Sequence, residues 1–296
     1  RTLQQANDSV SIWLERANLL AQKGNLLESF RYRQDIYTLD SLYELDNYLS
    51  IGVNIGLADY YSHHKLYKTS TEQLLKAKDK LNVHSDSASW AMVLRSLGNT
   101  YYVQERYDSA AYYYKAEEPY LLNDRIARIV SNINNQGLSI LESKPEEALP
   151  YFQRAFAMCP FCVRPHDVVS YAILDNIATV HFMLGDYEQA LAQYDTILYY
   201  LAPERELLND EHLNRRYWRT YLGMAECYMA QKDYPNAKEA LDLAEPFYHQ
   251  FRIKSKNQLR YLTLRKEWGV AQGNLQVAVA ATQQRVAHRD SLKETL

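Results

Sequence analysis

The chain has 296 residues, of which 47% are hydrophobic and 23% are charged, and its formal net charge is −3. This composition is typical of a globular protein. The slight acidity and the lack of any long Lys/Arg-rich run argue against nucleic acid as a partner of this segment. Since no apolar run reaches about 18 residues, we expect no membrane-spanning helix, and any membrane contact would need a segment outside this sequence.

An all-α fold is the direct inference from the residue pattern. Only 9 Gly and 8 Pro occur, and β-branched runs with alternating polarity, which indicate strands, are absent. Tyr is abundant, with 26 residues against 7 Phe, and its apolar ring with a polar tip suits half-buried seams between helices. Because the sequence starts at Arg1 and not at Met, we take it as a processed or trimmed piece in which the lack of a signal peptide is uninformative.

Seven helix pairs are expected in succession along the chain. In each pair, apolar residues recur three or four positions apart and therefore share one helical face. The expected pairs cover residues 8–43, 46–83, 88–120, 122–160, 168–203, 211–250 and 253–296. One position near the start of each second helix aligns the pairs: Ser29, Leu74, Ala110, Ala148, Ala190, Ala237 and Ala278. Placing this position near Leu74 gives the second pair a longer turn than the others.

The fifth pair, residues 171–203, shows the pattern most clearly. Gly185 separates its two helices, and glycine most readily takes the left-handed conformation that follows a helix end. Ala178 and Ala190 are small where the two helices cross, Tyr187 opens the second helix, and Pro203 stops it. Two amphipathic helices joined by so short a loop must pack antiparallel.

This pair resembles a tetratricopeptide repeat, a helix–turn–helix unit with small residues at two crossing positions, an aromatic residue between them and a proline near its end. The units here recur at about 41 residues, longer than the family's nominal spacing of about 34. The resemblance implies a single solenoid domain over residues 1–296. It also implies that about seven repeats stack into a right-handed superhelix whose first helices line an inner groove.

The resemblance places groove-facing residues three before and one after the small residue of each first helix. In the third pair these are Arg95 and Asn99, with Tyr102 one turn further on. A cation and an amide one turn apart resemble the clamp with which some family members hold a terminal carboxylate, and arginine binds carboxylates in a bidentate manner. The alternative is that Arg95 forms a salt bridge within the protein.

The equivalent residues of two other pairs do not continue that arrangement. They are Asp175 and Thr179 in the fifth pair and Leu222 and Glu226 in the sixth. We therefore expect no full carboxylate clamp, and we keep Asp175 and Glu226 as candidate groove residues. The neighbouring tyrosines 112–114 lie on a second helix, where they serve either the core or recognition.

Cys159 and Cys162 form a CxxC pair just after a second helix, and His166 follows. The spacing is compatible with unpaired thiols, a local disulfide in an oxidising compartment, or part of a metal site. Since no second CxxC or His pair completes a zinc site, we expect no metal. Cys227 and His181 lie on packed helix faces and are expected in the core.

No catalytic motif is present: the sequence contains no GxSxG, no phosphate-binding glycine loop and no HExxH. We therefore expect a protein that is not an enzyme, has no cofactor, and binds a protein or peptide in its groove. The polar helical stretch 282–296 resembles the segment that, in bacterial regulators with these repeats, leads into a membrane helix and an output domain.

The expected function is thus the sensor segment of a bacterial signalling protein, located in the periplasm or otherwise outside the cytoplasm. The alternative is a free-standing adaptor or lipoprotein that assembles a cell-surface or cytoplasmic complex. The oligomeric state does not follow from the sequence.

Overall fold

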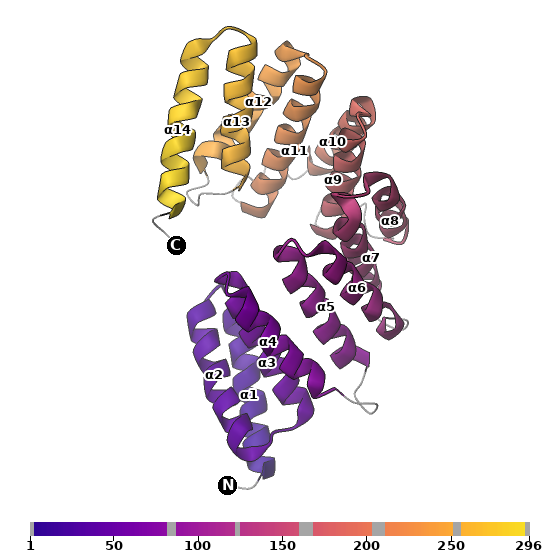
Figure 1. Ribbon diagram of the computed structural model, residues 1–296, viewed down its shortest axis with the longest axis vertical. Helices are drawn as coiled ribbons and strands as arrows, with labels where there is room; N and C mark the ends of the chain where they lie inside the picture. The colour runs from indigo at the N-terminus through magenta and orange to yellow at the C-terminus, as the bar shows by residue number, and fades with distance from the viewer. Residues whose placement is uncertain are drawn as a thin grey trace. The chain divides into compact units, whose positions relative to one another are not determined.

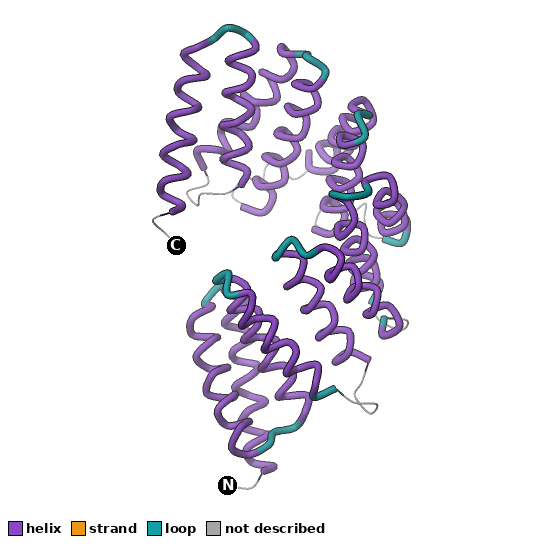
Figure 2. Tube along the Cα trace, viewed as in Figure 1, coloured by secondary structure: helices purple, strands orange, loops and turns teal. Residues whose placement is uncertain are grey.

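The computed structural model describes residues 3–81, 87–121, 125–159, 168–202, 211–250 and 256–293. In these ranges the regular secondary structure is helical, with no strand, as Figure 2 shows. The expected all-α fold of successive helix pairs is confirmed. The chain divides into two compact units, Arg1–Glu142 and Ser143–Leu296. The expectation of one continuous domain stays a prediction.

The first unit contains seven α-helices and one short 3₁₀ helix within its described residues (Figure 1). They are α1 (Leu3–Gln22), α2 (Leu26–Tyr43), α3 (Asn47–His63), α4 (Tyr67–Asp79), α5 (Ser87–Val103), α6 (Tyr107–Glu117), η1 (Glu118–Tyr120) and α7 (Ile126–Leu141). Helices α1 and α2, α3 and α4, and α5 and α6 pack as pairs. The first helices of successive pairs also pack on one another, α1 on α3 and α3 on α5, as stacked repeats require.

The second unit repeats this arrangement (Figure 1). Its described helices are α8 (Pro145–Ala157), α9 (Val168–Met183), α10 (Tyr187–Leu201), α11 (Glu211–Ala230), α12 (Tyr234–Gln250), α13 (Lys256–Ala271) and α14 (Leu275–Lys293). Helices α9 and α10, α11 and α12, and α13 and α14 form pairs, and α11 packs against both α9 and α13. Among the described residues, no helix is both long enough and apolar enough to cross a bilayer.

A left-handed residue ends the first helix in most of these pairs. Gly185 has φ of 81°, and the next residue, Asp186, donates its backbone N–H to the carbonyl of His181 at 2.8 Å. Such bonds satisfy carbonyl groups that the helix end would otherwise leave unpaired. Lys232 takes the same conformation in the sixth pair, with φ of 60°, although it carries a side chain.

The second pair differs from the sequence prediction, because its turn is as short as the others. Lys65 adopts φ of 61°, so the turn closes without a glycine, and Leu66 N–H bonds to the carbonyl of Tyr61 at 2.8 Å. The aligning residue is therefore Ser70, one turn before Leu74. Its hydroxyl donates to the carbonyl of Ala58 at 2.8 Å, as the Ser29 hydroxyl does to Ala17 in the first pair at 2.7 Å.

The core of each unit lies between the paired helices. Ala178 and Ala190 are completely buried at the crossing of α9 and α10, as predicted. Cys227 is also buried, whereas His181 is only partly buried, with its Nδ1 3.6 Å from a carboxylate oxygen of Asp186. Tyrosines fill the expected seams: the buried Tyr217 on α11 donates its hydroxyl to the carbonyl of Leu201 on α10 at 2.8 Å.

Candidate functional site

In the first unit, the candidate cation Arg95 is paired within the protein. Its Nε lies 3.6 Å from Oε1 of Glu117, a residue at the end of α6 that is fully buried. Asn132 of α7 donates its Nδ2 to the other carboxylate oxygen of Glu117 at 2.9 Å. A buried carboxylate needs such partners. Arg95 thus has the internal salt bridge that the sequence left open, and a ligand contact at Arg95 stays a prediction.

The other two candidates of α5 lie close to tyrosines. The hydroxyl of Tyr114 donates to Oδ1 of the exposed Asn99 at 2.8 Å. The ring of Tyr102 lies 5.5 Å from that of Tyr107, and burial, followed by the nearby Tyr107 and Glu142, raises the pKa of the Tyr102 phenol. Their role in ligand binding is likewise still a prediction.

The three neighbouring tyrosines of α6 have three different environments. Tyr114 is buried, Tyr113 stacks on Tyr101 with ring centroids 5.4 Å apart, and Tyr112 is 68% exposed. Part of the run therefore belongs to the core, as expected, and Tyr112 is the member that a partner can reach.

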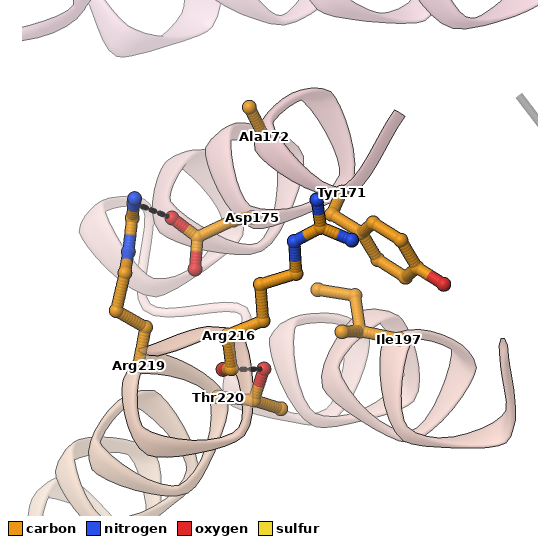
Figure 3. A pocket seen from close by; sticks show the side chains of 7 residues that line it. All are labelled: Tyr171, Ala172, Asp175, Ile197, Arg216, Arg219 and Thr220. Carbon is orange, nitrogen blue, oxygen red and sulfur yellow. Dashed lines mark hydrogen bonds and ion pairs between the residues drawn. The ribbon is translucent and has the colours of Figure 1, made fainter. Parts of the chain in front are cut away.

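In the second unit, the two acidic candidates each pair with an arginine from the next repeat. Asp175 of α9 forms an ion pair with Arg219 of α11 (Figure 3), and Glu226 of α11 forms a two-bond ion pair with Arg260 of α13. These four residues, which we call the charged face, tie together three successive first helices. Paired guanidinium and carboxylate groups in this geometry are among the stronger polar contacts in proteins.

The charged face is coupled to a buried tyrosine. Burial and then the negative charge of Asp175 raise the pKa of Tyr194, whose side chain reaches from α10. Burial alone would lower the pKa of Arg260, but the hydrogen bond and charge of Glu226, with smaller effects of Tyr194 and Asp175, leave it raised. The Arg260 guanidinium therefore stays charged, and Tyr194 stays protonated, at any physiological pH.

Sequence reasoning identified the carboxylates of the charged face and missed its arginines. Arg219 precedes Glu226 by two helical turns on α11, so helical periodicity alone could have placed the two on one face. Arg260 lies in the neighbouring repeat, and only a correct repeat alignment would have brought it beside Glu226.

Next to Asp175 lies a small pocket with a volume of about 100 Å³. Figure 3 shows the side chains that line it: Tyr171, Ala172, Asp175, Ile197, Arg216, Arg219 and Thr220. The guanidinium of Arg216 lies over the ring of Tyr171, with its Cζ 4.4 Å from the ring centroid. The hydroxyl of Thr220 donates to the carbonyl of Arg216 at 2.9 Å. We call this the arginine pocket.

A larger pocket of about 370 Å³ lies between α11 and α12. Its wall includes Tyr217 and Phe247, whose rings are nearly parallel with centroids 6.2 Å apart, and Tyr221 beside them. Three aromatic residues thus line this pocket beside polar and aliphatic ones, and it lies outside the positions that the repeat resemblance assigns to the groove.

Of the CxxC pair, only Cys159 lies within the described residues. Cys159 follows the end of α8, but Cys162 and His166 lie outside the described residues, so the disulfide stays a prediction. Burial raises the pKa of the Cys227 thiol to about 12, and this residue is a protonated core thiol at neutral pH. In the described part of the chain, no group of three His, Cys, Asp or Glu residues is arranged to hold a metal ion.

No protein-family model matches the sequence, and no curated protein matches it either. Solved structures do match. A signal transduction ATPase with numerous domains and a tetratricopeptide repeat sensor, from Pyrococcus horikoshii, aligns with a TM-score of 0.74 and 15% identity over 99% of this chain and 44% of that chain. This chain thus spans less than half of that ATPase.

Two further structures match over most of their own length. A tetratricopeptide repeat protein from Parabacteroides merdae aligns with a TM-score of 0.62 and 14% identity over 97% of both chains. A Rap protein complexed with competence and sporulation factor aligns with a TM-score of 0.63 and 15% identity over 95% of this chain and 88% of that chain. At these identities the comparisons show the fold, a tetratricopeptide-like helical-repeat solenoid.

Proposed function

We propose that this chain is a non-enzymatic scaffold that binds a protein or peptide on the charged face of its second unit. The observation that carries the proposal is that α9, α11 and α13 each contribute charged side chains to two ion pairs that share α11, Asp175–Arg219 and Glu226–Arg260. A long ligand can contact several repeats at once, whereas a single repeat offers too little surface for specific binding. The similar Rap protein is complexed with competence and sporulation factor, which supports the same use of this fold.

We further propose that the scaffold is the sensor segment of a bacterial signalling protein. The similar Pyrococcus horikoshii ATPase carries a tetratricopeptide repeat sensor, which supports this role. The test is the reading frame beyond Leu296. A membrane helix followed by an output domain is the expected result, and a stop codon there without a membrane helix would contradict the sensor role.

The second candidate is a free-standing adaptor or lipoprotein that assembles a cell-surface or cytoplasmic complex, and the similar tetratricopeptide repeat protein from Parabacteroides merdae supports it. For the sensor segment we propose a location outside the cytoplasm, on the basis of its tyrosine content and its CxxC pair. Mass mapping of Cys159 and Cys162 from the native host, without reductant, should show them joined. Two free thiols in that sample would argue for the cytoplasm.

Selection from a displayed library of random peptides tests the scaffold function itself. The wild-type chain should enrich a related set of sequences that bind with dissociation constants of roughly 1–100 µM. No enrichment, or binding that heat-unfolded protein reproduces, would contradict the proposal. The Arg95→Ala, Asn99→Ala double variant then tests the first unit: unchanged affinity for the enriched peptides removes these two residues from the binding surface.

A further inference from the structure

The guanidinium of Arg216 differs from those of Arg215 and Arg219 on the same helix, because no carboxylate pairs with it within the described residues. Its neighbours on α11 are paired, Arg215 with Glu211 and Arg219 with Asp175. Arg216 instead has its guanidinium carbon 4.4 Å from the centroid of the Tyr171 ring and lines the arginine pocket (Figure 3). Stacking on a tyrosine holds the cation in place and leaves the edge of its planar fork available for another partner.

The arginine pocket carries a net positive charge. Two guanidinium groups, of Arg216 and Arg219, line it together with one carboxylate, of Asp175. The side chains of Ala172 and Ile197 form apolar walls, beside which charge interactions are stronger than in open water. The pocket is therefore complementary to a group with a single negative charge.

The size of the pocket limits what it can hold. Its volume of about 100 Å³ is well below the roughly 300–1,000 Å³ of pockets that take whole small-molecule ligands. It fits one side-chain-sized group of a longer ligand. The carboxylate of Asp175 opposes a second negative charge, which disfavours a phosphate dianion.

We infer that the arginine pocket binds a carboxylate of the ligand, with Arg216 as the residue that holds it in a bidentate pair. This inference rests on the proposed scaffold function and names the chemistry of one ligand group. Arg216 is not at one of the groove positions given by the repeat resemblance, which fall on Leu222 and Glu226 in this pair. The carboxylate is either an Asp or Glu side chain or the end of a peptide chain.

Titration of the arginine Nε–Hε signals by NMR tests the inference on the full chain. Three probes are used: N-acetylglutamate N-methylamide for a side-chain carboxylate, N-acetylalanine for a terminal one, and inorganic phosphate. At least one carboxylate probe should shift the Arg216 signal saturably, with a dissociation constant of roughly 1–10 mM, as befits a few-atom ligand. The tighter of the two carboxylate probes identifies the source of the group.

Matched variants of adjacent arginines complete the test. In the Arg216→Gln chain the signal of Arg219, which also lines the pocket, reports binding, and its saturable shift should be lost. Arg215→Gln should leave that shift unchanged, since Arg215 is exposed and already paired with Glu211. Arg216→Lys should weaken binding less than Arg216→Gln, because the charge remains while the fork is lost. If Arg216→Gln fails to fold, comparison of the Arg215 and Arg216 signals in the wild-type chain still decides the matter.

Equal, non-saturable shifts at Arg215 and Arg216 would overturn the inference, as would phosphate binding more tightly than both carboxylates. Persistence of saturable carboxylate binding in a folded Arg216→Gln chain would also overturn it. A failed titration with peptides that still bind the wild-type chain would remove the carboxylate site and leave the scaffold function intact. If peptide selection failed and the titration succeeded, the carboxylate site would stand and the scaffold function would be contradicted.

Discussion

The ring of Tyr194 on α10 occupies the space beside Gly223 on α11, where a Cβ would lie far inside van der Waals contact with the ring. Tyr194 is 3% exposed, so it cannot turn into solvent without leaving the core. This contact joins two repeats, and it sets the position of α11 and hence of the charged face that α11 carries.

Gly223→Ala should therefore destabilise the protein by about 1–3 kcal/mol, the usual cost of overpacking a filled core. Urea unfolding followed by circular dichroism measures the change. Tyr194→Leu frees space beside Gly223, so in the double variant the Gly223→Ala change should cost less than it does alone. Strictly additive effects would show that the two residues do not compete for the same space.

Glu226→Gln should also destabilise the fold. The substitution removes the negative charge beside Arg260, whose side chain is 32% exposed, and a poorly compensated charge that is partly buried is unfavourable. We expect a loss of about 1–3 kcal/mol in the free energy of unfolding.

The control for this change is Glu211→Gln. Glu211 pairs with Arg215 on the surface of α11, where both side chains are largely exposed, and such pairs contribute less than about 1 kcal/mol. Equal losses in the two variants would mean that the Glu226–Arg260 pair is no more than a surface contact.

The buried Cys227 thiol should make stability depend on pH in the alkaline range. Burial raises its pKa to about 12 in the folded chain, whereas a thiol in the unfolded chain titrates near pH 8.5. Above that pH the unfolded state loses a proton that the native state keeps, so the thiol's contribution to stability is lost as pH rises from about 8.5 towards 12.

Comparison with Cys227→Ala isolates this contribution, since all other groups are shared. The stability advantage of wild type over the variant should shrink by about 1 kcal/mol between pH 7.5 and pH 9.5. Urea unfolding at the two pH values measures it. A constant difference would show that the native thiol titrates like an exposed one.

Substitutions at the left-handed turn residues of two repeats should change the stability of the protein in opposite directions. A Cβ added at Gly185 would meet nothing within 4 Å, so Gly185→Ala tests the backbone conformation alone and should cost about 1 kcal/mol. Lys232 has the same conformation with a side chain already present, and Lys232→Gly should be neutral or slightly stabilising. Thermal unfolding of both variants checks this, and a stabilising Gly185→Ala would contradict the turn geometry.

Most of the fold could be predicted from the sequence because it depends on local signals. Apolar spacing gives the helices, and Gly185 with its small neighbours Ala178 and Ala190 gives the antiparallel pair. The second pair was misaligned at Leu74 because Lys65 stands where a turn glycine was expected, which hid the short turn and the small residue Ser70 after it. The serine hydroxyl that bonds across the pair is visible only in the structure.

The ion pairs of the charged face could not be predicted, because they join residues that are far apart in the sequence. Asp175 and Glu226 were identified from their position after one repeat alignment, but their partners lie 44 and 34 residues away. Because the interval between repeats varies, no fixed offset finds both arginines. Arg216 was missed for a different reason, since its position is outside the groove positions of the family.

Binding of the ligand by the charged face is best tested by swapping the positions of the two charges within one of its ion pairs. The Glu226→Arg, Arg260→Glu double variant keeps a pair in place while reversing the field that a ligand meets. The Lys144→Glu, Glu147→Lys variant does the same to a more exposed pair at the start of α8 and is the control. Calorimetry gives the affinity of the library-selected peptides for each chain. We expect binding at least about 10-fold weaker on the first variant, a change of about 1.4 kcal/mol, and unchanged binding on the second. Equal affinities for wild type and the Glu226→Arg, Arg260→Glu variant would contradict ligand binding by the charged face.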